Sequence, residues 1–118
     1  MKPVVYAYSG CGTCKSALRW LADHRIDPEL KPIRETPPSR TELAGALAQL
    51  GSLRALFNTS GGDYKELNLK DRLASLSEAE ALDLLATRGN LVKRPFVAWN
   101  GRYMVGFKDP NVWEEFFR

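Results

Sequence analysis

The first third of the chain alternates between strand-like and helix-like patterns of apolar residues. Val4–Tyr8 is a β-branched and aromatic run bounded by proline and glycine, which is typical of a strand. Ser16–Ala22 then places apolar residues at helical spacing. Glu29–Ile33 alternates polar and apolar residues as a half-buried strand does, and Pro32 within it indicates an edge strand. The pattern predicts a strand, a helix and a second strand, in that order.

The middle of the chain is predicted to be helical. A helix capped by Ser39 or Thr41 runs to Gly51, and Ser77 begins another with the pattern of a capping box. Leucines supply the apolar faces of these helices: Leu43, Leu47 and Leu50 in the first, and Leu82, Leu84 and Leu85 in the second. Two shorter helical turns are predicted between them, over residues 52–57 and 64–68.

The pattern returns to strands near the end of the chain. Pro95–Trp99 and Arg102–Gly106 flank the turn dipeptide Asn100-Gly101, which predicts a β-hairpin. Asp109-Pro110 then begins a last helix with a largely aromatic apolar face. Strand, helix, strand, helical block, hairpin and helix is the order of a thioredoxin-like α/β domain. The helical block would be an insertion between the N-terminal β-α-β unit and the C-terminal hairpin and helix.

Length and composition fit this single domain. The chain has 118 residues, of which 44% are hydrophobic and 26% charged, so we expect one thioredoxin-like domain over residues 1–118. The net charge of +3 is spread along the chain, which favours anionic ligands or partners and argues against direct binding of nucleic acid. No apolar stretch is long enough to span a membrane, and the first residues lack the layout of a signal peptide. We therefore expect a cytoplasmic protein, in a reducing compartment.

Both cysteines lie where the first strand meets the first helix, in the stretch Cys11-Gly12-Thr13-Cys14. A thiol at a helix start is near unpaired backbone N–H groups and the positive end of the helix dipole, which favour its thiolate form. Cys11 is therefore the predicted nucleophile. Cys14 lies one helical turn further on the same face, close enough to form a disulfide with it.

Two other interpretations of the cysteines are less favourable. A structural zinc site needs four ligands, whereas the chain offers two cysteines and His24, which falls near the far end of the same helix, so no metal is expected. A structural disulfide across so short a loop would contribute little to stability. Redox or nucleophilic chemistry is the favoured interpretation.

Three polar side chains are further candidates for the site. Arg94 precedes Pro95 at the start of the predicted third strand, which in a thioredoxin-like fold lies beside the reactive cysteines. A guanidinium there would lower the pKa of the thiol and hold an oxyanion, although without the fold argument Arg94 is an ordinary surface arginine. Lys15 either adds positive charge near the thiolate or is simply solvated. Asn58 either donates hydrogen bonds to a ligand or serves only as a turn residue.

Together these motifs resemble the arsenate reductase and Spx family, a thioredoxin-like group, over nearly the whole chain. The resemblance rests on six segments: Cys11–Lys15, Pro37–Ser39, Phe57–Gly61, Tyr64–Leu67, Lys93–Pro95 and Val105–Lys108. It implies that Cys11 attacks arsenate and that Arg94 helps to bind the oxyanion. Well-studied glutaredoxin-linked arsenate reductases have serine at the place of Cys14 and arginine at the place of Asn58.

The function expected on these grounds is that of a thiol-dependent arsenate reductase. Cys11 would attack arsenic(V) while Arg94, Lys15, Asn58 and the amides of Gly12–Cys14 hold the oxyanion. Cys14 is a candidate for the resolving thiol. No bound cofactor is expected, but an external reductant is needed: thioredoxin, glutaredoxin or a low-molecular-weight thiol.

Two alternatives stay open at this point. One is an Spx-like redox-sensing regulator that binds RNA polymerase through the C-terminal domain of its α-subunit, and in which a disulfide between the cysteines would switch a protein surface. The other is a general thiol-disulfide reductase.

Overall fold

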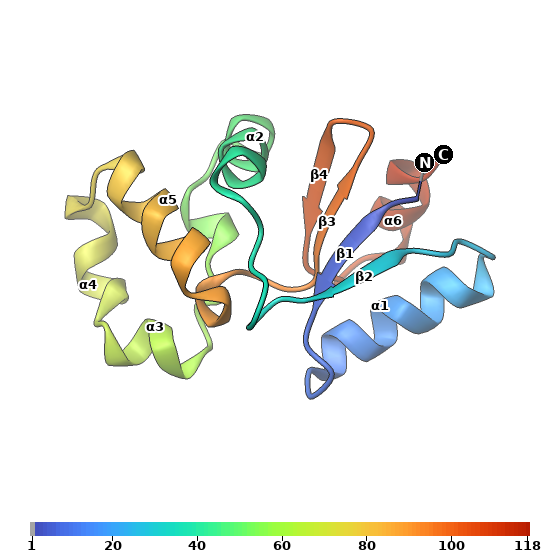
Figure 1. Ribbon diagram of the computed structural model, residues 1–118, viewed down its shortest axis with the longest axis horizontal. Helices are drawn as coiled ribbons and strands as arrows, with labels where there is room; N and C mark the ends of the chain where they lie inside the picture. Colours follow the sequence, from blue (N-terminus) through green and yellow to red (C-terminus); the bar gives the residue numbers. More distant parts are fainter. Residues whose placement is uncertain (1) are drawn as a thin grey trace.

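Four short strands form one mixed sheet whose two central strands come from opposite ends of the chain. β1 (Val4–Ala7) pairs in parallel with β2 (Glu29–Pro32) and antiparallel with β3 (Phe96–Trp99), which forms a hairpin with β4 (Arg102–Val105). The order across the sheet is β2-β1-β3-β4, as seen in the computed structural model, which describes residues 2–118 (Figure 1). The predicted strands, the hairpin and the edge position of β2 are confirmed.

Helices cover both faces of this sheet. α1 (Gly12–Asp23) and α6 (Pro110–Phe116) pack on one face, and a block of helices inserted between β2 and β3 packs on the other (Figure 1). The block consists of α2 (Arg40–Leu50), η1 (Arg54–Leu56), α3 (Gly62–Glu66), α4 (Leu69–Arg72), η2 (Leu73–Ser75), α5 (Glu78–Thr87) and η3 (Gly89–Leu91), where η denotes a 3-10 helix. The predicted thioredoxin-like α/β fold with a helical insertion is confirmed.

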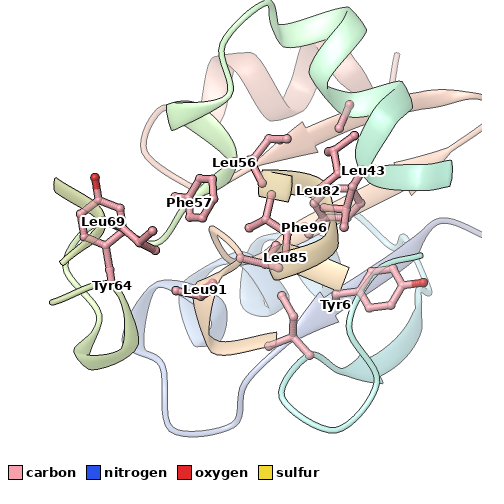
Figure 2. Close-up of a cluster of buried hydrophobic side chains, with 14 residues drawn as sticks. Tyr6, Leu43, Leu56, Phe57, Tyr64, Leu69, Leu82, Leu85, Leu91 and Phe96 are labelled. Carbon is pink, nitrogen blue, oxygen red and sulfur yellow. The ribbon is translucent and has the colours of Figure 1, made fainter. Parts of the chain in front are cut away.

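The sheet separates two hydrophobic cores because successive strand residues point to opposite faces. Val5 and Val97 face α1 and α6, where Trp113 is fully buried. Tyr6 and Phe96 face the helical block, and Figure 2 shows Phe96 near Leu43 of α2 and Leu82 and Leu85 of α5. A fully buried large apolar side chain contributes about 1.5–3 kcal/mol, so these two cores fix both α1 and the block to the same short strands.

Capping residues set the bounds of the two main helices of the block. The Ser39 side chain accepts from the backbone N–H of Glu42, whose carboxylate accepts from the Ser39 N–H, and Ser77 does the same with Glu80. Ser39, rather than Thr41, is therefore the cap. α2 ends at Gly51, whose φ of 72° is in the left-handed region that glycine adopts without strain.

Some details differ from the sequence prediction. β2 is not half-buried: all its residues are at least partly exposed, and the Leu30 side chain is 54% exposed, because neither core covers this edge. The turns α4, η2 and η3 were not predicted, since each is only three or four residues long and has no side-chain cap. Within residues 2–118, no helix is long and apolar enough to cross a membrane.

Candidate active site

Cys11 is the N-cap residue of α1, at the point where the chain leaves β1. Its backbone is extended, with φ of −97° and ψ of 120°, and its Sγ accepts a hydrogen bond from the backbone N–H of Cys14 over 3.4 Å. The Cys11 N–H donates to the carbonyl of Tyr8 over 3.1 Å, which closes the loop between strand and helix. The sulfur therefore takes the place of a capping oxygen at a helix start, where negative charge is stabilised.

The pKa values of the two thiols are shifted in opposite directions. Burial alone would raise the pKa of Cys11, but hydrogen bonds from Cys14 and Arg94 and the charge of Arg94 outweigh it, so the pKa of Cys11 is lowered. Cys14 is 1% exposed, and burial raises its pKa to about 11, with a further contribution from the neighbouring Cys11. Both cysteines are free thiols. Near neutral pH, Cys11 is the better nucleophile of the pair, because Cys14 keeps its proton.

Arg94 lies just before β3, which pairs with β1, and its side chain reaches the cysteine loop from there. The Arg94–Pro95 peptide bond is cis and Pro95 is buried. The Arg94 guanidinium interacts with the Cys11 thiol, and its carbon lies 5.0 Å from the centre of the Tyr8 ring. Arg94 therefore joins the thiol to the aromatic residue that closes the cysteine loop.

A pocket of about 190 Å³ opens beside Arg94, and its lining includes residues that the sequence analysis missed. Tyr8, Arg34 and Asn90 line it together with Arg94 and Asn58. Arg34 follows β2, and its guanidinium carbon is 4.7 Å from the centre of the Tyr8 ring. The charge of Arg34 and its place directly after a strand were visible in the sequence, but the fold alone brings it to Arg94.

The remaining candidate residues are divided between two sides of the cysteine loop. Asn58 lines the pocket with Arg94. Lys15 instead lines a groove of about 440 Å³ between α1 and β2, with Leu18 and Leu30, so the structure places it away from the Arg94 pocket. Gly12 and Thr13 are exposed in the first turn of α1. Among residues 2–118, no three side chains of the metal-binding types lie close enough together to hold an ion.

Comparison with known proteins identifies the family. The model of the ArsC family matches residues 6–116. The chain belongs to the ArsC family. A Bacillus subtilis (strain 168) protein, YusI, is 44% identical over 110 residues, which cover 92% of this chain and 93% of that protein. The crystal structure of a protein related to the ArsC family from Bacteroides fragilis has a TM-score of 0.90 and 40% identity, and covers 98% and 97% of the two chains.

Members of the ArsC family named as arsenate reductases are more distant. The arsenate reductase of Rhizobium meliloti (strain 1021) is 33% identical over 98 residues, which cover 82% of this chain and 69% of that enzyme. Membership of the ArsC family and these relatives support a thiol oxidoreductase. They also confirm the family resemblance drawn from the cysteine, asparagine and Arg-Pro motifs.

Proposed function

We propose that this ArsC family member is a thiol-dependent arsenate reductase with a two-cysteine mechanism. The observation that carries the proposal concerns two thiols one helical turn apart. The pKa of Cys11, which interacts with Arg94, is lowered, and the pKa of Cys14 is raised. This arrangement supplies a nucleophile, a cation for an oxyanion and a second thiol in reserve.

In the first step, the Cys11 thiolate attacks the arsenic atom of arsenate. An S–As bond forms, one As–O bond breaks, and the oxygen leaves as water after protonation. Arg94 and the exposed backbone N–H groups at the start of α1 stabilise the remaining oxygens. The arsenic stays in oxidation state V in this adduct.

In the second step, the Cys14 thiol gives its proton to an oxygen of the adduct and its sulfur attacks the Cys11 sulfur. The S–As bond breaks, its electron pair goes to arsenic, and arsenite is released while a Cys11–Cys14 disulfide forms. The adduct itself activates Cys14, because bonding to arsenic removes the negative charge on Cys11, which helps to raise the pKa of Cys14. Two reducing equivalents from an external thiol then restore the dithiol.

The test is a single turnover without reductant. Reduced protein is mixed with arsenate, quenched in acid and analysed by mass spectrometry, and arsenite is measured in the same sample. We expect a loss of two hydrogens mapped to Cys11 and Cys14, with one arsenite per protein. Cys11→Ser is the control and should give no arsenite. A protein that gives neither arsenite nor disulfide, although correctly folded, would rule the proposal out.

A general thiol-disulfide reductase is the second candidate, and the side chain at position 58 favours it. Asn58 is uncharged, whereas well-studied glutaredoxin-linked arsenate reductases have an arginine at this place. The pocket therefore has one cation fewer for an oxyanion than those enzymes have, and an uncharged disulfide substrate does not need that cation. Reduction of a small uncharged disulfide at a rate that exceeds arsenate reduction would select this candidate. The regulator alternative is tested with the C-terminal domain of the RNA polymerase α-subunit, by measuring its capture on oxidised and on reduced protein.

A further inference from the structure

Two arginines from distant parts of the chain lie against the same aromatic ring. The guanidinium carbons of Arg34 and Arg94 are 4.7 Å and 5.0 Å from the centre of the Tyr8 ring, and both side chains line the pocket of about 190 Å³. We call it the Arg34–Arg94 pocket. Because both guanidinium groups line the same pocket, an anion bound there would be attracted by two cations.

Neither arginine has a carboxylate partner among residues 2–118. The ion pairs found among these residues involve other cations. Asp63 is the one carboxylate among the lining residues, and it pairs with Arg88 over 3.6 Å. Arg94 is half-buried, so its charge is less screened by water than that of a surface arginine. The two guanidinium groups are therefore available to an external anion.

Apart from the Asp63 carboxylate, which is paired with Arg88, the other polar side chains of the lining are neutral. Asn58 and Asn90 each offer a side-chain amide that donates two hydrogen bonds. Two planar guanidinium groups with two amides match the oxygens of a carboxylate or of a tetrahedral oxyanion. Cys11 is not part of the lining, although the Arg94 guanidinium also interacts with its thiol, so a ligand in the pocket would share Arg94 with the thiolate without being bonded to the sulfur.

Two glycines hold the parts of the pocket in place. A Cβ at Gly89 would lie 1.8 Å from the Ile33 carbonyl oxygen and 2.9 Å from the Arg34 Cα, so only glycine lets the chain before Asn90 approach the Arg34 backbone this closely. A Cβ at Gly10 would lie 2.6 Å from the Tyr8 ring. The positions of Arg34 and of the ring are thus set by close backbone packing.

We propose that the Arg34–Arg94 pocket binds an oxyanionic group next to the Cys11 thiolate, with Arg34 supplying the second cation. The proposal rests on the proposed function in taking this group to be part of a reactant of Cys11. Two reactants carry such a group: free arsenate before it reaches the thiolate, and a low-molecular-weight thiol through its carboxylate. In either case the pocket delivers the reactant to the sulfur and shares Arg94 with it.

The experiment is an NMR titration of the full-length Cys11→Ser protein, which cannot react with either probe. Inorganic phosphate stands for arsenate, and S-methylglutathione stands for a thiol that carries carboxylates. The signals followed are the Nε–Hε groups of Arg34 and Arg94 and the side-chain amides of Asn58 and Asn90. We expect saturable shifts with one of the probes, and the probe that binds identifies the source of the anion.

Variants at position 34 decide the role of the second cation. Arg34→Ala in the same background should weaken binding about tenfold or more, which is the effect of one charge-assisted hydrogen-bonded pair, and Arg34→Lys should fall between. Arg19→Ala, which removes an exposed charge on α1, is the matched control and should bind within about twofold of the parent.

Binding of neither probe, or equal binding by Arg34→Ala and Arg19→Ala, would overturn the pocket assignment. The outcome is separable from that of the proposed function, because the titrated protein does not turn over. A parent protein that fails to reduce arsenate but whose pocket binds a probe would remove the proposed function alone.

Discussion

The backbone N–H of Cys14 donates to the sulfur of Cys11 over 3.4 Å, while the Cys14 side chain is buried. The two pKa values are shifted in opposite directions: the Cys14 N–H helps to lower the pKa of Cys11, whereas burial and, after it, the neighbouring Cys11 raise the pKa of Cys14. These opposite shifts predict a fixed order of reaction for the pair. We expect Cys11 to react first and Cys14 second, since loss of the charge on Cys11 removes one of the causes that raise the pKa of Cys14.

Alkylation rates should reveal this order. In single Cys→Ser variants, Cys11 should react with iodoacetamide more than about tenfold faster than Cys14 at neutral pH, because the thiolate is the reacting form. The pH profile of Cys11 should rise below the usual pKa of a thiol, and that of Cys14 only toward pH 11. Faster labelling of Cys14 at neutral pH would reverse the assignment of the nucleophile.

Cys14 should also make stability depend on alkaline pH. The pKa of its thiol is raised from 9.0 to about 11 in the folded protein, so the unfolded chain releases this proton first and stability falls as the pH rises through this interval. We expect the stability advantage of the parent over Cys14→Ala to narrow by about 1 kcal/mol between pH 8 and 9.5. Urea unfolding under reducing conditions at both pH values measures it, and a constant difference would contradict the raised pKa.

Arg94→Ala should impair activity far more than folding. The guanidinium is half-buried beside Cys11 and has no carboxylate partner within residues 2–118, so the free energy of unfolding should change by less than about 1 kcal/mol. Loss of a charge-assisted contact to the oxyanion, together with a higher pKa of Cys11, should lower kcat/KM for arsenate about 10- to 100-fold. Arg94→Lys should restore only part of this. Unchanged kcat/KM in Arg94→Ala would remove the arginine from the site.

The Cys14→Ser variant should separate two kinds of reductant. Without an internal disulfide, thioredoxin-linked turnover of arsenate should be lost, while attack by Cys11 and resolution by glutathione with glutaredoxin should persist. Steady-state rates with each donor measure this, and the intact protein is the control. Equal thioredoxin-linked rates in the variant and the parent would show that Cys14 does not resolve the adduct.

Gly89→Ala should be strongly destabilising because its methyl group would overlap the Ile33 carbonyl, 1.8 Å from the new Cβ. Moving that backbone should cost about 2–3 kcal/mol or more in the free energy of unfolding. Gly62→Ala is the matched control, since a Cβ there meets nothing within 4 Å. Thermal and urea unfolding of the two variants should differ clearly, and a Gly89→Ala protein as stable as Gly62→Ala would show that the loop can relax.

Local signals were sufficient for most of the fold and for the cysteine loop. Ser39 and Ser77 announce their helices because capping uses residues only three positions apart, and Cys11 falls at a strand-to-helix junction that is readable from periodicity. The exposure of Leu30 was not predictable in the same way. Alternation along β2 describes the strand itself, whereas its burial depends on whether a helix covers that edge.

The Arg34–Arg94 pocket could not be predicted from the sequence, for a related reason. Arg34 and Arg94 are sixty positions apart and meet only because β2 and β3 flank β1 on either side. Tyr8 was counted as the end of an apolar run, and nothing in its neighbours indicates that its ring receives two guanidinium groups. Contacts of this kind depend on the order of the strands in the sheet. The sequence pattern does not determine that order, which was expected only by analogy with the thioredoxin-like fold.

The chain leaves the sheet for the helical block just after Ile33 and returns to it through Gly89 and the residues up to Arg94, and these two crossings touch each other. The far end of the block, at α4 and η2, lies well away from them (Figure 1). Extra residues in a surface loop cost little free energy as long as its ends stay fixed. Insertions and substitutions at that outer end can therefore change its length and surface during evolution, while both arginines keep their positions where the insertion joins the sheet.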